Sequence, residues 1–235
     1  MIRSHLSVWA NVTLALAGPA VVAVLGAQLE PHPATLAAHA IGLIAIAVIT
    51  LGVFAWATCG EGYTLRRMGF GQCSWATPLL AIALTAFFVL LFGPIAYWAL
   101  ARCGLQGFGP GIQAVNQLPT AYLMLTIVIV ASAEELLYRG YAIARLSDLT
   151  GSHLLASIVS TVAFGLTHVP MWAWAPAATT ILSGGIVTAV YLWRQDILAL
   201  ILAHIATDLC GIVLAPHLAR AVANRPTLCR DPPMS

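Results

Sequence analysis

Two adjacent carboxylates and an arginine at the end of an apolar run are the residues of this sequence best suited to chemistry. Glu134, Glu135 and Arg139 lie in the stretch Ser132–Gly140, which closes a hydrophobic segment that begins near Pro119. Ionisable groups in hydrocarbon cost free energy and usually mark functional sites. A positioned carboxylate can also act as a general base toward water. The stretch therefore predicts a reactive site inside an apolar segment.

Helical spacing gives the two glutamates different roles. Residues four apart on a helix share a face, so Glu135 and Arg139 are placed to form an ion pair. Glu134 points about 100° away from Glu135 on a helix with 3.6 residues per turn, which leaves it free to face a cavity. The alternative is purely structural, with all three residues forming one ion-pair cluster that holds helices together.

Two further polar pairs follow in later apolar segments, and each again has a spacing of four residues. Phe164 precedes His168, so the aromatic ring could form a wall of the pocket that holds the imidazole. His204 precedes Asp208, and an acid beside a histidine commonly orients the ring and fixes its tautomer. Taken alone, each pair also fits a packing or interfacial role. Together with the glutamates, they favour a functional site.

The composition is that of an integral membrane protein. The chain has 235 residues, of which 60% are hydrophobic and 8% are charged, whereas soluble domains carry about 25% charged residues. We expect an all-α bundle that forms a single membrane domain over residues 1–235. All basic residues are arginine, and a net charge of +2 is too small to indicate nucleic-acid binding. The five cysteines form no CxxC pair, which argues against a disulfide framework or a zinc knuckle.

Seven segments are long enough to cross a bilayer, which takes about 20 apolar residues. They are Leu6–Leu29, Leu36–Thr58, Thr77–Ala101, Leu118–Leu146, Ser152–Val169, Ala177–Trp193 and Ile197–Pro216. The first is longer than the roughly 7–15 residues of a signal-peptide core, so we expect it to be retained as a span. The glycine-rich stretch Gly104–Gly111 predicts a loop, or alternatively a re-entrant segment.

Arginine placement predicts a cytoplasmic N-terminus, since cytoplasmic loops carry an excess of basic residues. In that orientation six arginines share the cytoplasmic side: Arg3, Arg66, Arg67, Arg139, Arg145 and Arg194. The connections Glu30–Ala34 and Pro170–Pro176 carry no arginine, as expected for the far side. Arg102 is an exception, because it falls on the far side. With seven spans the C-terminal tail, which carries Arg220, Arg225 and Arg230, falls there too. An eighth membrane element would return this tail to the cytoplasmic side.

The depths of the polar pairs predict that they meet. Glu134 and His168 are equally distant in sequence from Gly151, in the predicted turn Asp148–Ser152. In a helical hairpin, both would lie roughly 25 Å from that turn at 1.5 Å per residue. His204 lies roughly 13 Å past the next turn on the same side, Arg194–Asp196. Its depth in the membrane equals that of Glu134 and His168 if the hairpin around Gly151 projects about 10 Å beyond the membrane. We therefore expect Glu134, His168, His204 and Asp208 to cluster near the cytoplasmic leaflet.

Taken in order, the three pairs resemble the three motifs of the CPBP family, the CAAX-prenyl-protease and bacteriocin-processing proteins, also called Abi. The resemblance covers residues 118–216. Its most specific part is the first motif, with Arg139 and Gly140. The resemblance implies an all-helical intramembrane endopeptidase in which Glu134 and His168 activate a water molecule. It further implies that His204 and the residue at 208 stabilise the oxyanion, while Glu135, Arg139 and Phe164 support the site.

Position 208 departs from the family pattern, because family members often have asparagine where this chain has Asp208. An ionised aspartate cannot donate a hydrogen bond to an oxyanion. Asp208 must therefore be protonated, orient His204 or ligate a metal, and we favour orientation of His204. The mechanism that we favour requires no cofactor. Zn²⁺ is the alternative, because two histidines and a glutamate form the ligand set of some catalytic zinc sites.

Two non-proteolytic functions remain as alternatives. One is an immunity protein that binds a peptide in the same cavity without cleaving it. The other is a proton-coupled transporter, since intramembrane glutamates and histidines also serve as proton relays. For a protease, the resemblance admits prenylated CAAX peptides, bacteriocin leader peptides and C-terminal membrane-anchor tails. The compact chain and its arginine bias favour a bacterial inner membrane, so we expect a membrane-associated peptide and the bilayer as partners.

Overall fold

The computed structural model describes residues 5–29, 36–71 and 74–223, and all regular structure in these ranges is helical. Among the described residues, seven helices are long and apolar enough to cross a membrane: Leu6–Gln28, Leu36–Gly60, Ala76–Arg102, Thr120–Thr150, His153–Trp172, Trp174–Arg194 and Ile197–Ala219. They confirm the seven predicted spans and the all-α membrane fold, with ends that differ by only a few residues. The connection Glu30–Ala34, Arg3 and the tail arginines Arg225 and Arg230 lie outside the described residues.

Several spans combine more than one type of helix. The first three consist of α1 (His5–Leu29), of α2 (Leu36–Ala55) with η1 (Trp56–Gly60), and of α3 (Ala76–Phe87), η3 (Phe88–Phe92) and α4 (Gly93–Arg102). The fourth and fifth consist of α6 (Thr120–Glu134), η4 (Glu135–Ile143) and α7 (Ala144–Thr150), and of α8 (His153–Thr167) with α9 (Val169–Trp172). The last two are α10 (Trp174–Arg194), and α11 (Ile197–Asp208) with η5 (Leu209–Leu214) and α12 (Ala215–Ala223). The segments η1, η3, η4 and η5 are π-helices.

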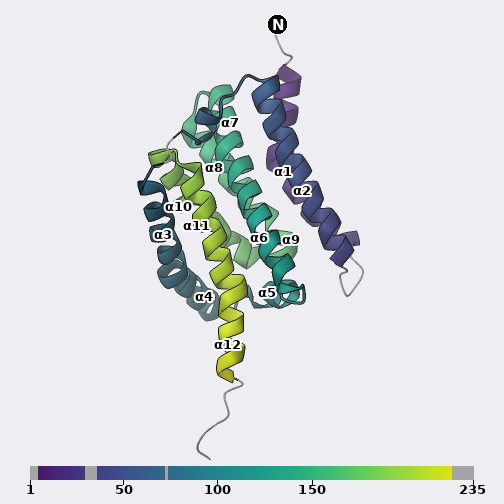
Figure 1. Cartoon of the computed structure of the whole chain (residues 1–235), viewed down its shortest axis with the longest axis vertical. Helices are drawn as coiled ribbons and strands as arrows, with labels where there is room; N and C mark the ends of the chain where they lie inside the picture. The colour runs from purple at the N-terminus through teal and green to yellow at the C-terminus, as the bar shows by residue number, and fades with distance from the viewer. Residues whose placement is uncertain (1–4, 30–35, 72–73, 224–235) are drawn as a thin grey trace, which may run out of the picture.

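The spans pack as one bundle around the fourth and fifth. Helices α1 and α2 lie side by side along one flank, whereas α3 and α4 lie on the opposite flank (Figure 1). Between these flanks, α8 packs against α10, α1 and η4. The last span continues into α12, which projects beyond the end of the bundle (Figure 1). We call this the α12 end, and the opposite end, where α7 lies, the arginine-rich end.

The tryptophans mark the two ends of the bundle. Trp9, Trp56, Trp75 and Trp193 lie near the ends of spans at the arginine-rich end, whereas Trp98, Trp172 and Trp174 lie toward the α12 end. The helical path from Trp75 to Trp98 is about 34 Å, and that from Trp174 to Trp193 is about 28 Å, at 1.5 Å per residue. These lengths match a hydrocarbon core about 30 Å thick. Tryptophan is enriched at both membrane interfaces, so the two groups indicate where the bilayer begins and ends.

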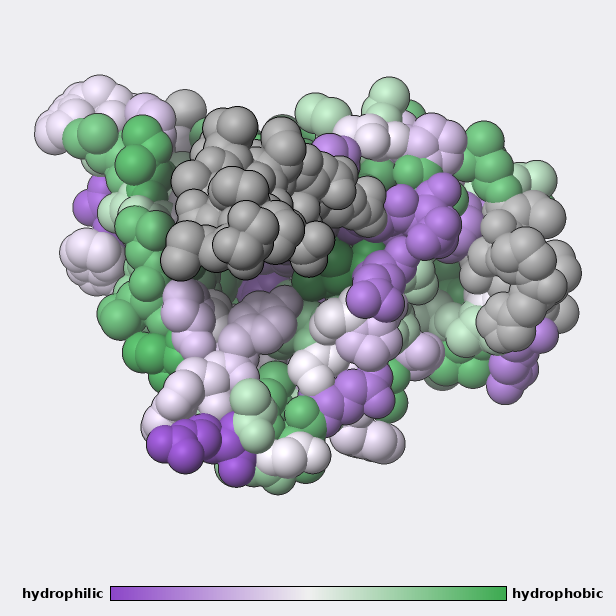
Figure 2. All heavy atoms as spheres, turned by 90° about the horizontal axis from the view of Figure 1, so that it is seen from below, coloured by the Kyte–Doolittle hydropathy of each residue, from purple (hydrophilic) through white to green (hydrophobic). Residues whose placement is uncertain are grey.

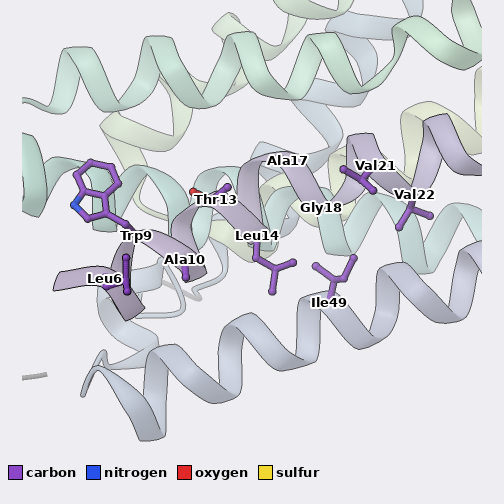
Figure 3. A pocket seen from close by; sticks show the side chains of 10 residues that line it. All are labelled: Leu6, Trp9, Ala10, Thr13, Leu14, Ala17, Gly18, Val21, Val22 and Ile49. Atoms are coloured by element: carbon purple, nitrogen blue, oxygen red, sulfur yellow. The ribbon is translucent and has the colours of Figure 1, made fainter. Parts of the chain in front are cut away.

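The outer surface is suited to lipid. Seen from the α12 end, hydrophobic residues cover much of the flanks, and hydrophilic residues lie across the end face (Figure 2). An apolar groove also runs along α1 beside α2 (Figure 3). Its lining includes Leu6, Trp9, Leu14, Val21, Val22 and Ile49. Such a surface is stable against acyl chains, which replace water as the solvent of these helices.

The fourth span is longer than the membrane is thick. Its 31 residues correspond to about 46 Å of helix, against a hydrocarbon core about 30 Å thick, which fits the projection expected of the hairpin around Gly151. Gly151 ends α7 with a φ of 69°, a left-handed conformation that glycine adopts at little cost. Ser152 then caps α8, because its Oγ accepts a hydrogen bond from the Leu155 N–H at 3.2 Å.

A polar network holds this projecting hairpin to the segment that follows η1. Tyr63 donates a hydrogen bond to Asp148, and Arg67 Nη2 lies 2.9 Å from the other oxygen of that carboxylate. Arg145 Nε lies 3.0 Å from Glu61 Oε2. Burial and the hydrogen bond with Asp148 raise the pKa of Tyr63 to about 12, against the opposing effect of the nearby Arg145 cation. The phenol therefore stays protonated in the folded protein.

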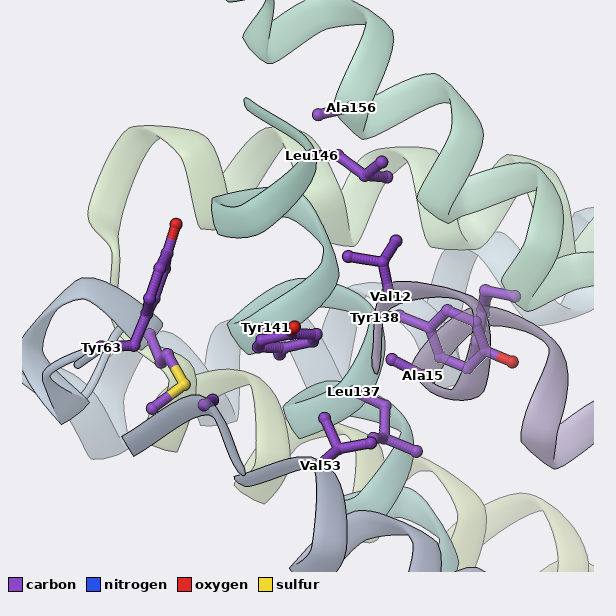
Figure 4. Close-up of a cluster of buried hydrophobic side chains, with 12 residues drawn as sticks. Val12, Ala15, Val53, Tyr63, Leu137, Tyr138, Tyr141, Leu146 and Ala156 are labelled. Carbon is purple, nitrogen blue, oxygen red and sulfur yellow. The ribbon is translucent and has the colours of Figure 1, made fainter. Parts of the chain in front are cut away.

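The largest hydrophobic cluster surrounds η4 and fixes its position. Tyr138 and Tyr141, both from η4, are fully buried between α1, α2 and α8 (Figure 4). The Tyr138 hydroxyl lies 2.7 Å from Thr167 Oγ1, and the Tyr141 hydroxyl donates to Glu61 Oε1 at 2.9 Å. Each buried phenol thus has a polar partner, as buried tyrosines usually do.

The segment after η1 also packs over the arginine-rich end of the bundle. It contains the short helix η2 (Leu65–Met68), whose Met68 is fully buried. Gly69 follows with a φ of 90°, and its carbonyl accepts a hydrogen bond from the Ile197 N–H at 3.1 Å. At Gly140 a Cβ would lie 3.2 Å from the Met68 carbonyl oxygen. The glycine of the first motif therefore permits a close approach of two backbones.

The predicted loop Gly104–Gly111 is partly wrong. The turn ends at Phe108, and helix α5 covers Gly109–Val115. Pro110 lies in the first turn of α5, where its missing N–H and fixed φ favour the start of a helix. The glycines therefore flank a helix start as well as forming a turn.

Candidate active site

Three spans bring the predicted acidic and imidazole groups together. Glu134 is the last residue of α6, His168 directly follows α8, and His204 lies in α11. His168 Nε2 lies 3.9 Å from Glu134 Oε1, and His204 Nε2 lies 3.7 Å from Glu134 Oε2. Each imidazole therefore faces a different oxygen of the same carboxylate. The expectation from helix lengths that these groups share one level is confirmed.

Glu135 occupies a separate, fully buried position beside the cluster. Its Oε1 lies 3.0 Å from Arg139 Nη1, and both side chains are 1% exposed, which confirms the predicted ion pair. The same oxygen lies 2.9 Å from His204 Nδ1. This second contact joins residues 69 positions apart in sequence, and no local spacing predicts it.

Arg139 is part of the site and not a loop arginine, which corrects its use as evidence for membrane orientation. Its Nη2 donates to the Gly184 carbonyl at 3.4 Å, and its Nε donates to Thr188 Oγ1 at 3.5 Å. The guanidinium also lies 4.1 Å from the centre of the Phe164 ring, a cation–π contact. The physical reason is the buried Glu135 carboxylate, which stabilises the cation inside the bundle.

Phe164 forms a wall of the site, as its spacing predicts. Its ring centre lies 4.8 Å from that of His168 and 6.2 Å from that of His204, in edge-on arrangements. The Phe164 carbonyl oxygen lies 2.9 Å from His168 Nδ1. A carbonyl only accepts hydrogen bonds, so His168 Nδ1 carries the hydrogen, and Nε2 of the neutral ring is an acceptor.

Asp208 faces the same nitrogen as Glu134 does. Its Oδ2 lies 3.7 Å from His204 Nε2, and its side chain is 33% exposed. We expected Asp208 to orient His204, but His204 Nδ1 instead donates the orienting hydrogen bond to Glu135. The reason is geometric, because Asp208 lies beyond hydrogen-bond distance and on the opposite side of the ring. Asp208 is the most exposed of the four predicted catalytic side chains.

Helix α10 contributes site residues that carry no sequence signal. Thr188 contacts Arg139 and also lies 3.0 Å, oxygen to oxygen, from Thr161 of α8. At Gly184 a Cβ would lie 2.9 Å from Phe164 Cδ1 and 3.1 Å from Arg139 Nη2. A small residue at 184 therefore lets α10 approach the site, and only the packing of the bundle reveals this.

Zn²⁺ is the alternative cofactor that two histidines and a glutamate suggest at this site. Within the described ranges, no group of three or more His, Cys, Asp or Glu side chains is arranged to hold a metal ion. Nδ1 of each imidazole has a protein partner, as it usually does in metal-ligating histidines as well, and the two Nε2 atoms face separate oxygens of Glu134. The metal-free mechanism stays a prediction, and we derive no chemical step through zinc.

The site lies between the two groups of tryptophans. Along α11, His204 lies about 11 Å from the helix start at the arginine-rich end, at 1.5 Å per residue. Along α8 and α9, His168 lies about 6 Å from Trp172, toward the α12 end. The reactive groups thus lie between the two groups of tryptophans, and a location in the cytoplasmic leaflet stays a prediction.

Fold and site together define a polytopic helical membrane protein with a glutamate held between two histidines. Residues 116–210 match the family described as type II CAAX prenyl endopeptidase Rce1-like. The matched region contains all three motifs, from Glu134 to Asp208, and confirms the resemblance seen in the sequence. The match supports a CAAX-type intramembrane endopeptidase. Neither the curated proteins nor the solved structures include a match to the chain.

Proposed function

We propose that this protein hydrolyses a peptide bond in a membrane-associated peptide or C-terminal tail, with a water molecule as the nucleophile. The observation that carries the proposal is the position of Glu134, whose two carboxylate oxygens face the Nε2 atoms of His168 and His204. This geometry provides a base, a second acceptor for the water and a group that can stabilise the oxyanion. It needs no serine or cysteine nucleophile.

The gap between Glu134 and His168 suits one water molecule. The 3.9 Å between Oε1 and Nε2 is too long for a direct hydrogen bond. A water oxygen about 2.8 Å from both atoms fits this gap with an angle of about 90°. Its two hydrogens would point toward the carboxylate and the imidazole, because both atoms are acceptors. The lone pairs of the oxygen would then be free to attack a scissile carbonyl carbon.

The proposed reaction balances with these groups alone. As the C–O bond forms, Glu134 accepts one proton from the water, and the carbonyl electrons move to the oxygen. His204 then stabilises that oxyanion, an effect worth about 10²–10³-fold in rate for a single positioned donor. The proton next passes to the amide nitrogen, the C–N bond breaks, and a carboxylic acid and an amine leave. The mechanism uses no cofactor and forms no covalent link to the enzyme.

The membrane setting supports the remaining parts of the proposal. Exposed arginines at one end of the bundle, among them Arg66 and Arg67, favour a cytoplasmic position for that end and for the N-terminus. We propose the bacterial inner membrane as the location. Prenylated CAAX peptides, leader peptides and C-terminal anchor tails are the candidate substrates, and all three present a peptide bond close to a bilayer.

The test is cleavage of candidate tail and leader peptides in membranes, followed by mass spectrometry. We expect wild type to cut at one bond, and Glu134→Gln and His168→Gln to lose the activity. His153→Gln is the matched control, because His153 lies at the start of α8 and far along the helix from the site. Retained cleavage in Glu134→Gln would refute the proposal. Tight peptide binding without cleavage by wild type and both site variants would instead favour an immunity protein.

A further inference from the structure

We propose that Glu135 is a positioning residue that holds His204 with a hydrogen on Nδ1, so that His204 stabilises the oxyanion only as the doubly protonated imidazolium. The inference rests on the proposed endopeptidase function and adds a role that the motif pattern does not assign to Glu135. The spacing of the motif pairs Glu135 with Arg139 and predicts no contact with His204. The structure gives the same carboxylate oxygen two partners, Arg139 and His204.

The first step concerns the hydrogen on Nδ1. Glu135 Oε1 lies 3.0 Å from Arg139 Nη1 and 2.9 Å from His204 Nδ1. Arginine is always charged and has no acceptor atoms, so it donates to Glu135 and keeps it a carboxylate. A carboxylate accepts hydrogen bonds and donates none. His204 Nδ1 must therefore be the donor and carry the hydrogen.

The second step concerns Nε2. A neutral imidazole has one donor and one acceptor nitrogen, so a neutral His204 would turn a lone pair toward the oxyanion and repel it. Donation from Nε2 requires the imidazolium. Nε2 faces Glu134 Oε2 and Asp208 Oδ2, each at 3.7 Å. With Glu135 at Nδ1, three carboxyl groups surround this ring and supply the counter-charge, while the other charged or titratable neighbours are Arg139 and His168.

The third step is the contrast with His168. Its Nδ1 also has a protein partner, but that partner is the uncharged Phe164 carbonyl at 2.9 Å. His168 can therefore remain neutral and accept a hydrogen from water at Nε2, whereas His204 acts as a cation. In serine proteases as well, a carboxylate that accepts a hydrogen bond from Nδ1 of the catalytic histidine orients the ring and stabilises the imidazolium. The different Nδ1 partners thus separate water activation from oxyanion stabilisation.

A spectroscopic test does not depend on finding a substrate. Wild type carrying ¹⁵N-labelled histidine is studied by NMR in detergent micelles at neutral pH, and His204→Gln and His168→Gln identify the two sets of resonances. We expect both ring nitrogens of His204 to be protonated, but only Nδ1 of His168. An unprotonated Nδ1 at His204, or two protonated nitrogens at His168, would overturn the inference. Absence of cleavage by wild type with the expected resonances would instead count against the proposed function alone.

Paired variants separate positioning from charge neutralisation. Arg139→Met removes the guanidinium and leaves the His204 imidazolium, 2.9 Å from Glu135 Oε1, as the counter-charge that keeps Glu135 a carboxylate. Glu135→Leu combined with Arg139→Met replaces the whole buried ion pair by apolar groups, a change that proteins often tolerate. We expect the double variant to have a kcat about 100-fold below that of Arg139→Met, as a misplaced catalytic group does, with unchanged KM and altered His204 resonances. Equal kcat values and equal His204 resonances in the two variants would overturn the inference.

Discussion

Replacing Gly184 by alanine should displace side chains of the site by overpacking, although residue 184 contacts no substrate in the proposed mechanism. The new Cβ would lie 2.9 Å from Phe164 Cδ1 and 3.1 Å from Arg139 Nη2. Neither neighbour can move away easily. Phe164 packs edge-on against Tyr138 and His168 with ring centres 5.4 and 4.8 Å apart, and Arg139 is held by Glu135. Overpacking of this kind costs about 1–3 kcal/mol.

The neighbouring residue provides a matched control. At Gly185 a Cβ would meet no atom within 4 Å, so Gly185→Ala keeps only the helix-propensity gain, up to about 1 kcal/mol. Gly184→Ala has the same gain, and the overpacking cost therefore equals the difference between the two variants. For a chain of this size, about 1 kcal/mol shifts Tm by about 2–4 °C. We expect Gly184→Ala to melt at the lower temperature and to cleave peptide more slowly.

Thermal unfolding in detergent micelles and cleavage of the same peptide are the two assays. Phe164 and Arg139 connect Gly184 to His168 and Glu135, so stability and cleavage should fall together in Gly184→Ala and stay at or above wild type in Gly185→Ala. If both alanine variants have the same Tm and the same rate, α10 does not pack against the site as described, and the reasoning fails.

Three further predictions concern the polar groups. The pKa of Tyr63 is raised from 10.0 to about 12, so the folded state holds the phenol proton more tightly than the unfolded state does. The stability that this proton contributes should be lost as the pH rises from about 10 to 12, which lowers Tm. Tyr63→Phe has no phenol proton to lose, so its Tm should decrease less over the same pH range. A strong chelator should leave cleavage unchanged, and loss of cleavage that zinc restores would contradict the metal-free mechanism. Asp208→Asn should retain most activity, because an amide can donate to the oxyanion; a fall in kcat as large as the 10²–10³-fold cost of a lost oxyanion donor would show that the carboxyl group itself is required.

The sequence predicts the spans well because a membrane restricts the available structures. In hydrocarbon every backbone polar group needs an internal partner, so a long apolar segment must form a helix. All seven predicted spans, including Leu6–Gln28 and Ile197–Ala219, are confirmed on this basis. The stretch Gly104–Gly111 is less well predicted, because glycine and Pro110 are compatible with both a turn and a helix start.

Within the site, contacts one helical turn apart are predictable and distant ones are not. The spacing of four residues predicts the Glu135–Arg139 ion pair and the contact of Phe164 with His168, and both are confirmed. Arg139, by contrast, looks like a cytoplasmic arginine in the sequence but is 1% exposed. Its burial depends on a carboxylate, a carbonyl and a ring from three different spans, and these meet only when the bundle packs.

The sequence by itself determined the membrane class, the seven spans and the identity of Glu134, His168 and His204 as groups at one level, because apolar length and helical rise are local properties of the chain. Only the tertiary structure decided the partners of each group. Glu135 holds His204 across 69 residues, and Gly184 of α10 lies against Phe164 and Arg139. The physical reason is that side-chain direction depends on how each helix rotates and tilts in the bundle, and packing sets both.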